Sequence, residues 1–214
     1  MYRYALSTVY EELLRAIAQS MYKNILQSFR NNIQQGDIFY WYESYRRLSD
    51  FDAGEVIALV DDYMVDDYEK EYLLFVMHFL QMERGLSSAV EVVKHIARCK
   101  DMVPAGINNI SFRDVYSLSK SGSPIISYSH ILHEKSGSIA GLKQFKGAIT
   151  EIKGSTAGII QIDGMNLTAT FVPSIIDENG RKREFTAENV TDRVTFNLMF
   201  AYSGLRAWNV DLES

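Results

Sequence analysis

The last seventy residues constrain the fold most, because short apolar segments alternate there with turn residues. Gly154, Asp163-Gly164 and Ser203-Gly204 separate most of these segments, and one long connection runs from Pro173 to Asn189. Segments of this kind are typical of antiparallel strands. The predicted strands span residues 144–152, 157–163, 166–172, 193–201 and 205–210. Five strands with a long third connection predict a small five-stranded antiparallel β-barrel at residues 144–214, a closed arrangement without exposed sheet edges.

Residues 1–120 carry the periodicity of amphipathic helices. A capping-box pattern, Thr8-x-x-Glu11, precedes an apolar stripe that continues to Phe29, and an aromatic segment follows Asp37. Further helices are predicted to begin after three capping sites: Asp52, Asp66 or Asp67, and Ser88. The helix after Asp67 is apolar on all sides and is predicted to be central. Short connections between neighbouring helices favour a helical bundle at residues 1–120.

The stretch between these two regions combines weak helix and strand signals. Ser111-x-x-Asp114 predicts a short helix to about Lys120, "SGSP" ends it, and residues 125–133 have strand character. A helix followed by a hairpin is also found in winged-helix domains, but only Arg113 and Lys120 are basic on this helix. The predicted class is therefore α+β with two domains. A helical bundle at 1–120 is joined to the barrel at 144–214 by a linker at 121–143 that includes one candidate strand.

The predicted barrel also resembles a known family over residues 144–210. The matching residues are Gly147, Gly158 before Ile159-Ile160, Phe171-Val172, Phe185, "RVTF" at 193–196, and Gly204 followed by "AWNV" at 207–210. Together they are similar to the cold-shock domain family, which implies an OB-type barrel that binds single-stranded RNA or DNA by stacking rings on bases. The sequence departs from that family where the rings are expected: at Glu151, Ile152, Ala157 and Ile159, and in Phe171-Val172-Pro173-Ser174, where only Phe171 keeps its ring.

Eight residues are predicted to contact nucleic acid. Phe171 and Trp208 are candidates for stacking on bases, although an aromatic side chain in a barrel strand also serves as core. For Trp208 the alternative is packing against the helical part. The predicted phosphate contacts are Lys146, Lys153, Arg181, Lys182, Arg183 and Arg206, with Lys143 beside them. The alternative for the run at 181–183 is a solvated loop.

Charge limits how such a barrel can bind. The chain has 22 basic and 27 acidic residues and a net charge of −5. Residues 144–214 carry seven basic and nine acidic side chains, so this region lacks the positive charge of a nonspecific nucleic-acid binder. Recognition is therefore expected to depend on a few well-placed groups.

The four histidines and the single cysteine raise the question of a metal site. His95 and Cys99 lie one helical turn apart, and His130-x-x-His133 follows. This spacing is not a common zinc signature, and histidines three apart on a strand point to opposite faces. No metal or other cofactor is therefore predicted. The sequence has no nucleophile-elbow, phosphate-loop or zinc-protease motif, so no enzymatic activity is predicted either.

Two functional classes remain open. In the first, which the resemblance favours, the barrel binds single-stranded RNA or DNA weakly while the helices mediate protein contacts or a homodimer. In the second, the chain is an adaptor or accessory subunit of a larger assembly, and its barrel does not bind nucleic acid. This class is favoured by "IFYWYESY" at 38–45, with five aromatic rings in eight residues. The single cysteine and the lack of an apolar run of about 20 residues predict a cytoplasmic protein without a membrane segment.

Overall fold

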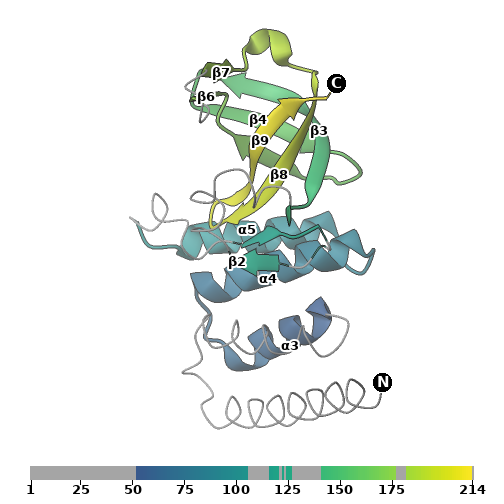
Figure 1. Cartoon of the computed structure of the whole chain (residues 1–214). Coiled ribbons are helices and arrows are strands. Elements are labelled where there is room, and N and C mark those ends of the chain that lie inside the picture. Colours follow the sequence, from purple (N-terminus) through teal and green to yellow (C-terminus); the bar gives the residue numbers. More distant parts are fainter. Residues whose placement is uncertain are drawn as a thin grey trace, which may run out of the picture. The chain divides into compact units, whose positions relative to one another are not determined.

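The computed structural model describes residues 52–105, 116–120, 122, 124–126, 141–176 and 182–213, and it has the predicted α+β class. The chain divides into two compact units, residues 1–102 and residues 103–214 (Figure 1). Helices form most of the described part of the first unit, and strands form most of the described part of the second. Several predictions lie outside the described residues: the helices after Thr8 and Asp37, the aromatic segment at 38–45, Arg181, His130 and His133.

Three helices begin directly after the capping residues Asp52, Asp67 and Ser88, as the sequence predicted. They are α3 (Ala53–Tyr63), α4 (Tyr68–Glu83) and α5 (Ala89–Met102). The Asp52 carboxylate accepts a hydrogen bond from the Gly54 amide at 2.7 Å, and the Asp67 carboxylate accepts one from the Lys70 amide at 2.9 Å. The Ser88 hydroxyl accepts a longer one, 3.4 Å, from the Glu91 amide. Side-chain acceptors at these positions satisfy amide groups that have no partner within the helix.

Helix α4 is the centre of the helical unit, as its apolar surface predicted. Its residues 70–77, together with Phe79 and Leu80, are buried. The helix contacts both α3 and α5, so side chains on most of its circumference have a packing partner. Among the described helices, none is both long and apolar enough to cross a membrane.

All five strands predicted in the C-terminal region are present. They are β3 (Gln144–Lys153), β4 (Ala157–Ile162), β5 (Thr168–Phe171), β8 (Arg193–Ala201) and β9 (Gly204–Leu212). Pairing runs from β3 to β4, β5 and β9, and then through β8 back to β3 (Figure 1). The five strands are therefore linked in a closed circuit of pairings.

The prediction of a purely antiparallel arrangement is wrong at one place. Strands β5 and β9 run parallel, with Thr170 opposite Arg206, whereas the other four pairings of the circuit are antiparallel. The reason is geometric: an odd number of strands that close into a circuit cannot alternate in direction at every step. One parallel pair is unavoidable, and the sheet is mixed.

The prediction of a short helix from Ser111 to Lys120 is also wrong in its described part. Residues Tyr116–Leu118 form strand β1, which pairs with β8 and with β2 (Pro124–Ile126). Ser117 and Leu118 are buried in this pairing. Tertiary pairing has overridden a local capping signal, as it often does for short segments.

The long connection after β5 has structure of its own. It holds a hairpin of β6 (Ser174–Ile176) and β7 (Lys182–Glu184), followed by the 3₁₀ turn η3 (Ala187–Asn189). The Thr186 hydroxyl and the Asn189 side chain cap this turn reciprocally. The connection returns the chain to the start of β8.

Candidate functional site

The outward face of the strand circuit is the surface on which nucleic-acid binding was predicted. Register places Ile159 on β4 beside Thr170 on β5, and Thr170 beside Arg206 on β9. Thr170 is exposed, and the other two are half-buried. This row across three strands offers an aliphatic side chain, a hydroxyl and a guanidinium, and it has no aromatic ring.

Phe171 does not lie on this outward face. Its side chain is only 2% exposed, and its ring packs edge-to-face on Phe185 with 5.6 Å between the centroids. A base can stack only on a ring whose face is open. Phe171 lies in the core, as the alternative prediction from the sequence had it, and its ring offers no open face to a base.

Trp208 remains the one predicted ring with an accessible part. It lies on β9, opposite Asn197 of β8, and is half-buried. Its indole Nε1 is buried and has no hydrogen-bond partner among the described residues. The residue that follows it, Asn209, has a positive φ of 49° at an irregular step of the β8–β9 ladder, a conformation that Asn tolerates better than most residues.

The lysines on β3 are engaged in ion pairs. Lys146 pairs with Glu213, and Lys153 pairs with Glu151 at 3.2 Å. Hydrogen bonding from Lys146 is the main cause that lowers the pKa of the Glu213 carboxyl below its usual value. The two lysines are seven residues apart on one strand, which corresponds to about 23 Å at the usual rise. They do not form one basic patch.

The other basic candidates are divided between two places. Lys182 and Arg183 belong to the β6–β7 hairpin, opposite Ile176 and Ile175. Arg206 lies on the circuit, in the outward row with Thr170. Arg193 is a further cation, which was not among the contacts predicted from the sequence. Its Nη1 and Nη2 atoms both donate to the Asp163 carboxylate, and its Nε donates to Glu213 at 3.4 Å. Lys146, Lys153 and Arg193 are thus each balanced by neighbouring carboxylates.

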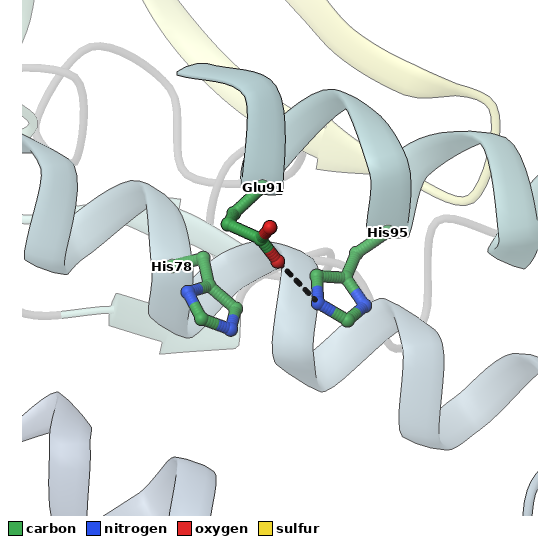
Figure 2. Close-up of side chains that lie close together, drawn as sticks. All are labelled: His78, Glu91 and His95. Atoms are coloured by element: carbon green, nitrogen blue, oxygen red, sulfur yellow. Dashed lines mark ion pairs between the residues drawn. The ribbon is translucent and has the colours of Figure 1, made fainter. Parts of the chain in front are cut away.

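A second cluster, which the sequence did not predict, lies between α4 and α5. His78 of α4 and Glu91 and His95 of α5 bring one ligand-type atom each to within 4.8 Å of one another (Figure 2). His95 Nε2 lies 3.8 Å from Glu91 Oε2, and its Nδ1 lies 2.6 Å from Oε2 of the buried Glu71. The spacing of Glu91 and His95, four residues apart on one helix, was the available signal. The approach of His78 to these two residues depends on how α4 packs against α5.

Cys99 does not join this cluster. Its side chain is fully buried, and Sγ donates a long hydrogen bond of 3.5 Å to the Tyr68 carbonyl oxygen. Burial, with smaller contributions from Glu71 and Asp67, raises the pKa of the Cys99 thiol to about 12. Zinc binds the thiolate form, so this thiol is a poor ligand.

The outer face of α5 is a third feature. Leu86, just before the helix, and Val90 and Val93 within it are 69%, 73% and 51% exposed. Val90 and Val93 are one helical turn apart, and the exposed Ala97 follows on the same face at the next turn. Lone exposed aliphatic residues are common, but Val90 and Val93 share one face of the helix, and these two residues, together with Leu86 just before the helix, are called the apolar stripe of α5 below.

Comparison with known proteins gives no relative from which a role could be transferred: no family model, curated protein or solved structure matches this chain.

Proposed function

We propose that the chain is a non-catalytic adaptor that binds another protein through the outer face of α5. The observation that carries this proposal is the apolar stripe of Leu86, Val90 and Val93, which is more than half exposed at each position. Burying such a stripe against a partner is favourable by about 25 cal/mol for each Å² of apolar surface removed from water. Amphipathic helices commonly dock in this way, with anchors one turn apart.

The charges beside the stripe indicate the chemistry of the partner. Lys94 and Lys100 are both exposed, and helical spacing places them on opposite sides of the stripe. Lys94 pairs with Glu91 at 2.8 Å, and the exposed Asp101 lies on the same side as Lys94. Among the residues that the structure describes, the positive charge without a carboxylate contact is therefore on the Lys100 side. An amphipathic helix with an apolar stripe and flanking Asp or Glu residues is complementary to this surface, since opposite charges at the rim guide association.

The strand circuit supports a finer proposal about the fold. We propose that β3, β4, β5, β8 and β9 form an OB-type barrel similar to cold-shock domains, and that the two units are separate domains. The support is the order of pairing. In chain order, β5 and β9 are the third and fifth of these strands, and they are parallel neighbours. In barrels of this type, the second and third strands and the adjacent loops bind oligonucleotides.

Weak binding of single-stranded RNA or DNA is the second candidate function. The observation that favours it is the presence of Trp208 and Arg206 on β9, beside the strand that corresponds to the ligand face. Base stacking on one ring contributes about 1–3 kcal/mol, so a single tryptophan supports only weak binding. The ion pairs of Lys146 and Lys153 reduce the charge available to phosphates.

A peptide-binding experiment tests the adaptor proposal. The full chain is titrated into a labelled amphipathic peptide with Leu at helical spacing and Glu on the flanks, and fluorescence anisotropy is recorded. Val93→Asp is expected to weaken binding by at least about tenfold, because it places a charge in the apolar contact and repels the acidic flanks. Val65→Asp is the matched control, since Val65 is also 51% exposed but lies outside α5. The same peptide with Lys in place of Glu is expected to bind more weakly.

Labelled single-stranded oligonucleotides at two salt concentrations test the second candidate. The adaptor proposal predicts that Val93→Asp weakens peptide binding while oligonucleotides bind neither the parent nor the variant. Oligonucleotide binding that falls with salt and is lost in Trp208→Ala and Arg206→Ala would establish the second candidate. Equal affinity for the Glu and Lys peptides, or an unchanged affinity of Val93→Asp, would refute the docking face.

A further inference from the structure

Helices α4 and α5 bring together three side chains of the kind that bind transition metals. His78 projects from α4, and Glu91 and His95 project from successive turns of α5, with the Glu91 carboxylate between the two imidazoles in Figure 2. We propose that these three residues bind a divalent transition metal ion, with zinc as the best fit, through Nε2 of His78, a carboxylate oxygen of Glu91 and Nε2 of His95. This site uses other ligand residues than the docking face on the outer side of α5, and the two features share only the Glu91–Lys94 ion pair.

The orientation of His95 is set by a buried carboxylate. Its Nδ1 lies 2.6 Å from Glu71 Oε2, and the side chains of His95 and Glu71 are 6% and 5% exposed. An Nδ1–H that donates to Glu71 leaves the lone pair on Nε2, on the side of Glu91. A carboxylate behind a histidine fixes its tautomer and raises its basicity as a ligand, the arrangement that supports many zinc histidines. Arg98 balances Glu71 at the other carboxylate oxygen, Oε1, at 3.5 Å.

His78 has a comparable anchor. Its Nδ1 lies 3.1 Å from the Ser87 hydroxyl, and its ring stacks on that of His95 with centroids 4.9 Å apart and an interplanar angle of 7°. With Nδ1–H donating to Ser87, Nε2 carries the lone pair.

To bind an ion, the three ligand atoms must move closer together and the two stacked rings must turn toward a common point. Ligand atoms bonded to tetrahedral zinc at about 2.0–2.1 Å lie about 3.3 Å from one another, compared with the 4.8 Å limit within which they lie here. Glu91 must exchange its 2.8 Å ion pair with Lys94 for the metal, which is feasible because both side chains are at least 40% exposed. Two imidazoles and one carboxylate suit zinc better than magnesium or calcium, which prefer oxygen ligands. Three protein ligands leave a fourth position for water or another molecule.

Metal titration of the full chain tests the site. The chelator-treated protein is titrated with Zn²⁺ by calorimetry and with Co²⁺ by visible absorption, which reports tetrahedral coordination. One equivalent is expected to bind, and His78→Gln and Glu91→Gln are each expected to weaken the affinity by at least about tenfold. Glu71→Gln, which alters the support of His95 rather than a ligand, is expected to weaken it by about 10–100-fold. Lys94→Gln removes the competitor for Glu91 and is expected to bind equally well or more tightly.

Circular dichroism separates a lost ligand from a lost fold. Glu91 is 40% exposed, so Glu91→Gln is expected to keep the helical signal of the parent while it loses affinity. The proposal is overturned if the parent binds no Zn²⁺ below about 100 μM, or if His78→Gln and Glu91→Gln bind as tightly as the parent. It is also overturned if binding disappears in His130→Ala or His133→Ala and persists in His78→Gln, because the ligands would then lie elsewhere.

Discussion

The ring of Phe171 on β5 fills the space that a side chain on Gly158 of β4 would need. The two residues are opposite one another in the ladder, and a Cβ added at Gly158 would lie 2.3 Å from Phe171 Cε1 and 2.6 Å from its Cζ. The Phe171 ring is buried and also packs edge-to-face on Phe185. The glycine therefore permits the aromatic core of the strand circuit.

Gly158→Ala is the first prediction. Overpacking of a core commonly costs about 1–3 kcal/mol, and we expect a loss of this size in the free energy of unfolding, measured by denaturant titration followed by near-ultraviolet circular dichroism. Gly141→Ala is the control, since a Cβ at Gly141 meets nothing within 4 Å. Equal stability of the two variants would show that Phe171 does not press on this strand.

The five strands of the circuit were predictable because their signal is local. Alternating apolar residues lie within several of the segments, turn glycines lie between most of them, and β8 has the predicted bounds 193–201. The three-residue strands β1, β6 and β7 are too short to show a period, and the parallel β5–β9 pairing depends on closure of the whole circuit.

The side-chain expectations differ in origin. In "TATF" of β5, alternation groups the apolar Ala169 and Phe171 on one face and Thr168 and Thr170 on the other, so the pattern itself favours a core position for Phe171, and only the resemblance to cold-shock domains made it a candidate for stacking. The structure turns Phe171 inward. The approach of His78 to Glu91 and His95 is set by the rotation of two packed helices, which periodicity within either helix does not determine.

Cys99 provides the second prediction. A thiol with a pKa of about 12 is ionised in only about one molecule in ten thousand at pH 8, and its Sγ is also buried. We expect a thiol-reactive dye at pH 8 to label native protein far more slowly than protein in concentrated urea. Because the chain has a single cysteine, the labelling rate reports opening of the α4–α5 region. Fast labelling under native conditions would contradict the described burial.

Ser117 provides the third prediction. This residue of β1 is completely buried, and its hydroxyl has no hydrogen-bond partner among the described residues. Removing an unsatisfied buried polar group relieves its desolvation penalty, so Ser117→Ala is expected to leave stability unchanged or to raise it by up to about 1 kcal/mol.

Ser88→Ala is the matched substitution, and it is expected to lower the stability of the protein. The Ser88 hydroxyl accepts from the Glu91 amide at the start of α5, and loss of such a cap costs about 0.5–2 kcal/mol. Both variants are compared by thermal unfolding. A loss of stability in Ser117→Ala similar to that in Ser88→Ala would mean that the Ser117 hydroxyl has a partner after all.

The ion pair between Arg193 and Asp163 provides the fourth prediction, a pH dependence. Hydrogen bonding from Arg193 is the main cause that lowers the pKa of Asp163 below 3.8 in the folded protein. The folded state therefore holds the ionised carboxylate more firmly than the unfolded state does. The resulting stability is present above the unfolded pKa, near 3.9, and is lost as pH falls through the folded pKa.

Arg193→Gln is expected to lower the melting temperature at pH 7 by only about one or two degrees, because both partners are more than 40% exposed and solvent screens the pair. The difference from the parent should shrink as pH falls below about 3.9, and it should also shrink at pH 7 in 1 M salt. Asp163→Asn should reproduce this profile, and the double variant should lose less than the sum of the single losses. A difference that persists unchanged at low pH and high salt would assign the effect to packing of the Arg193 side chain instead of its charge.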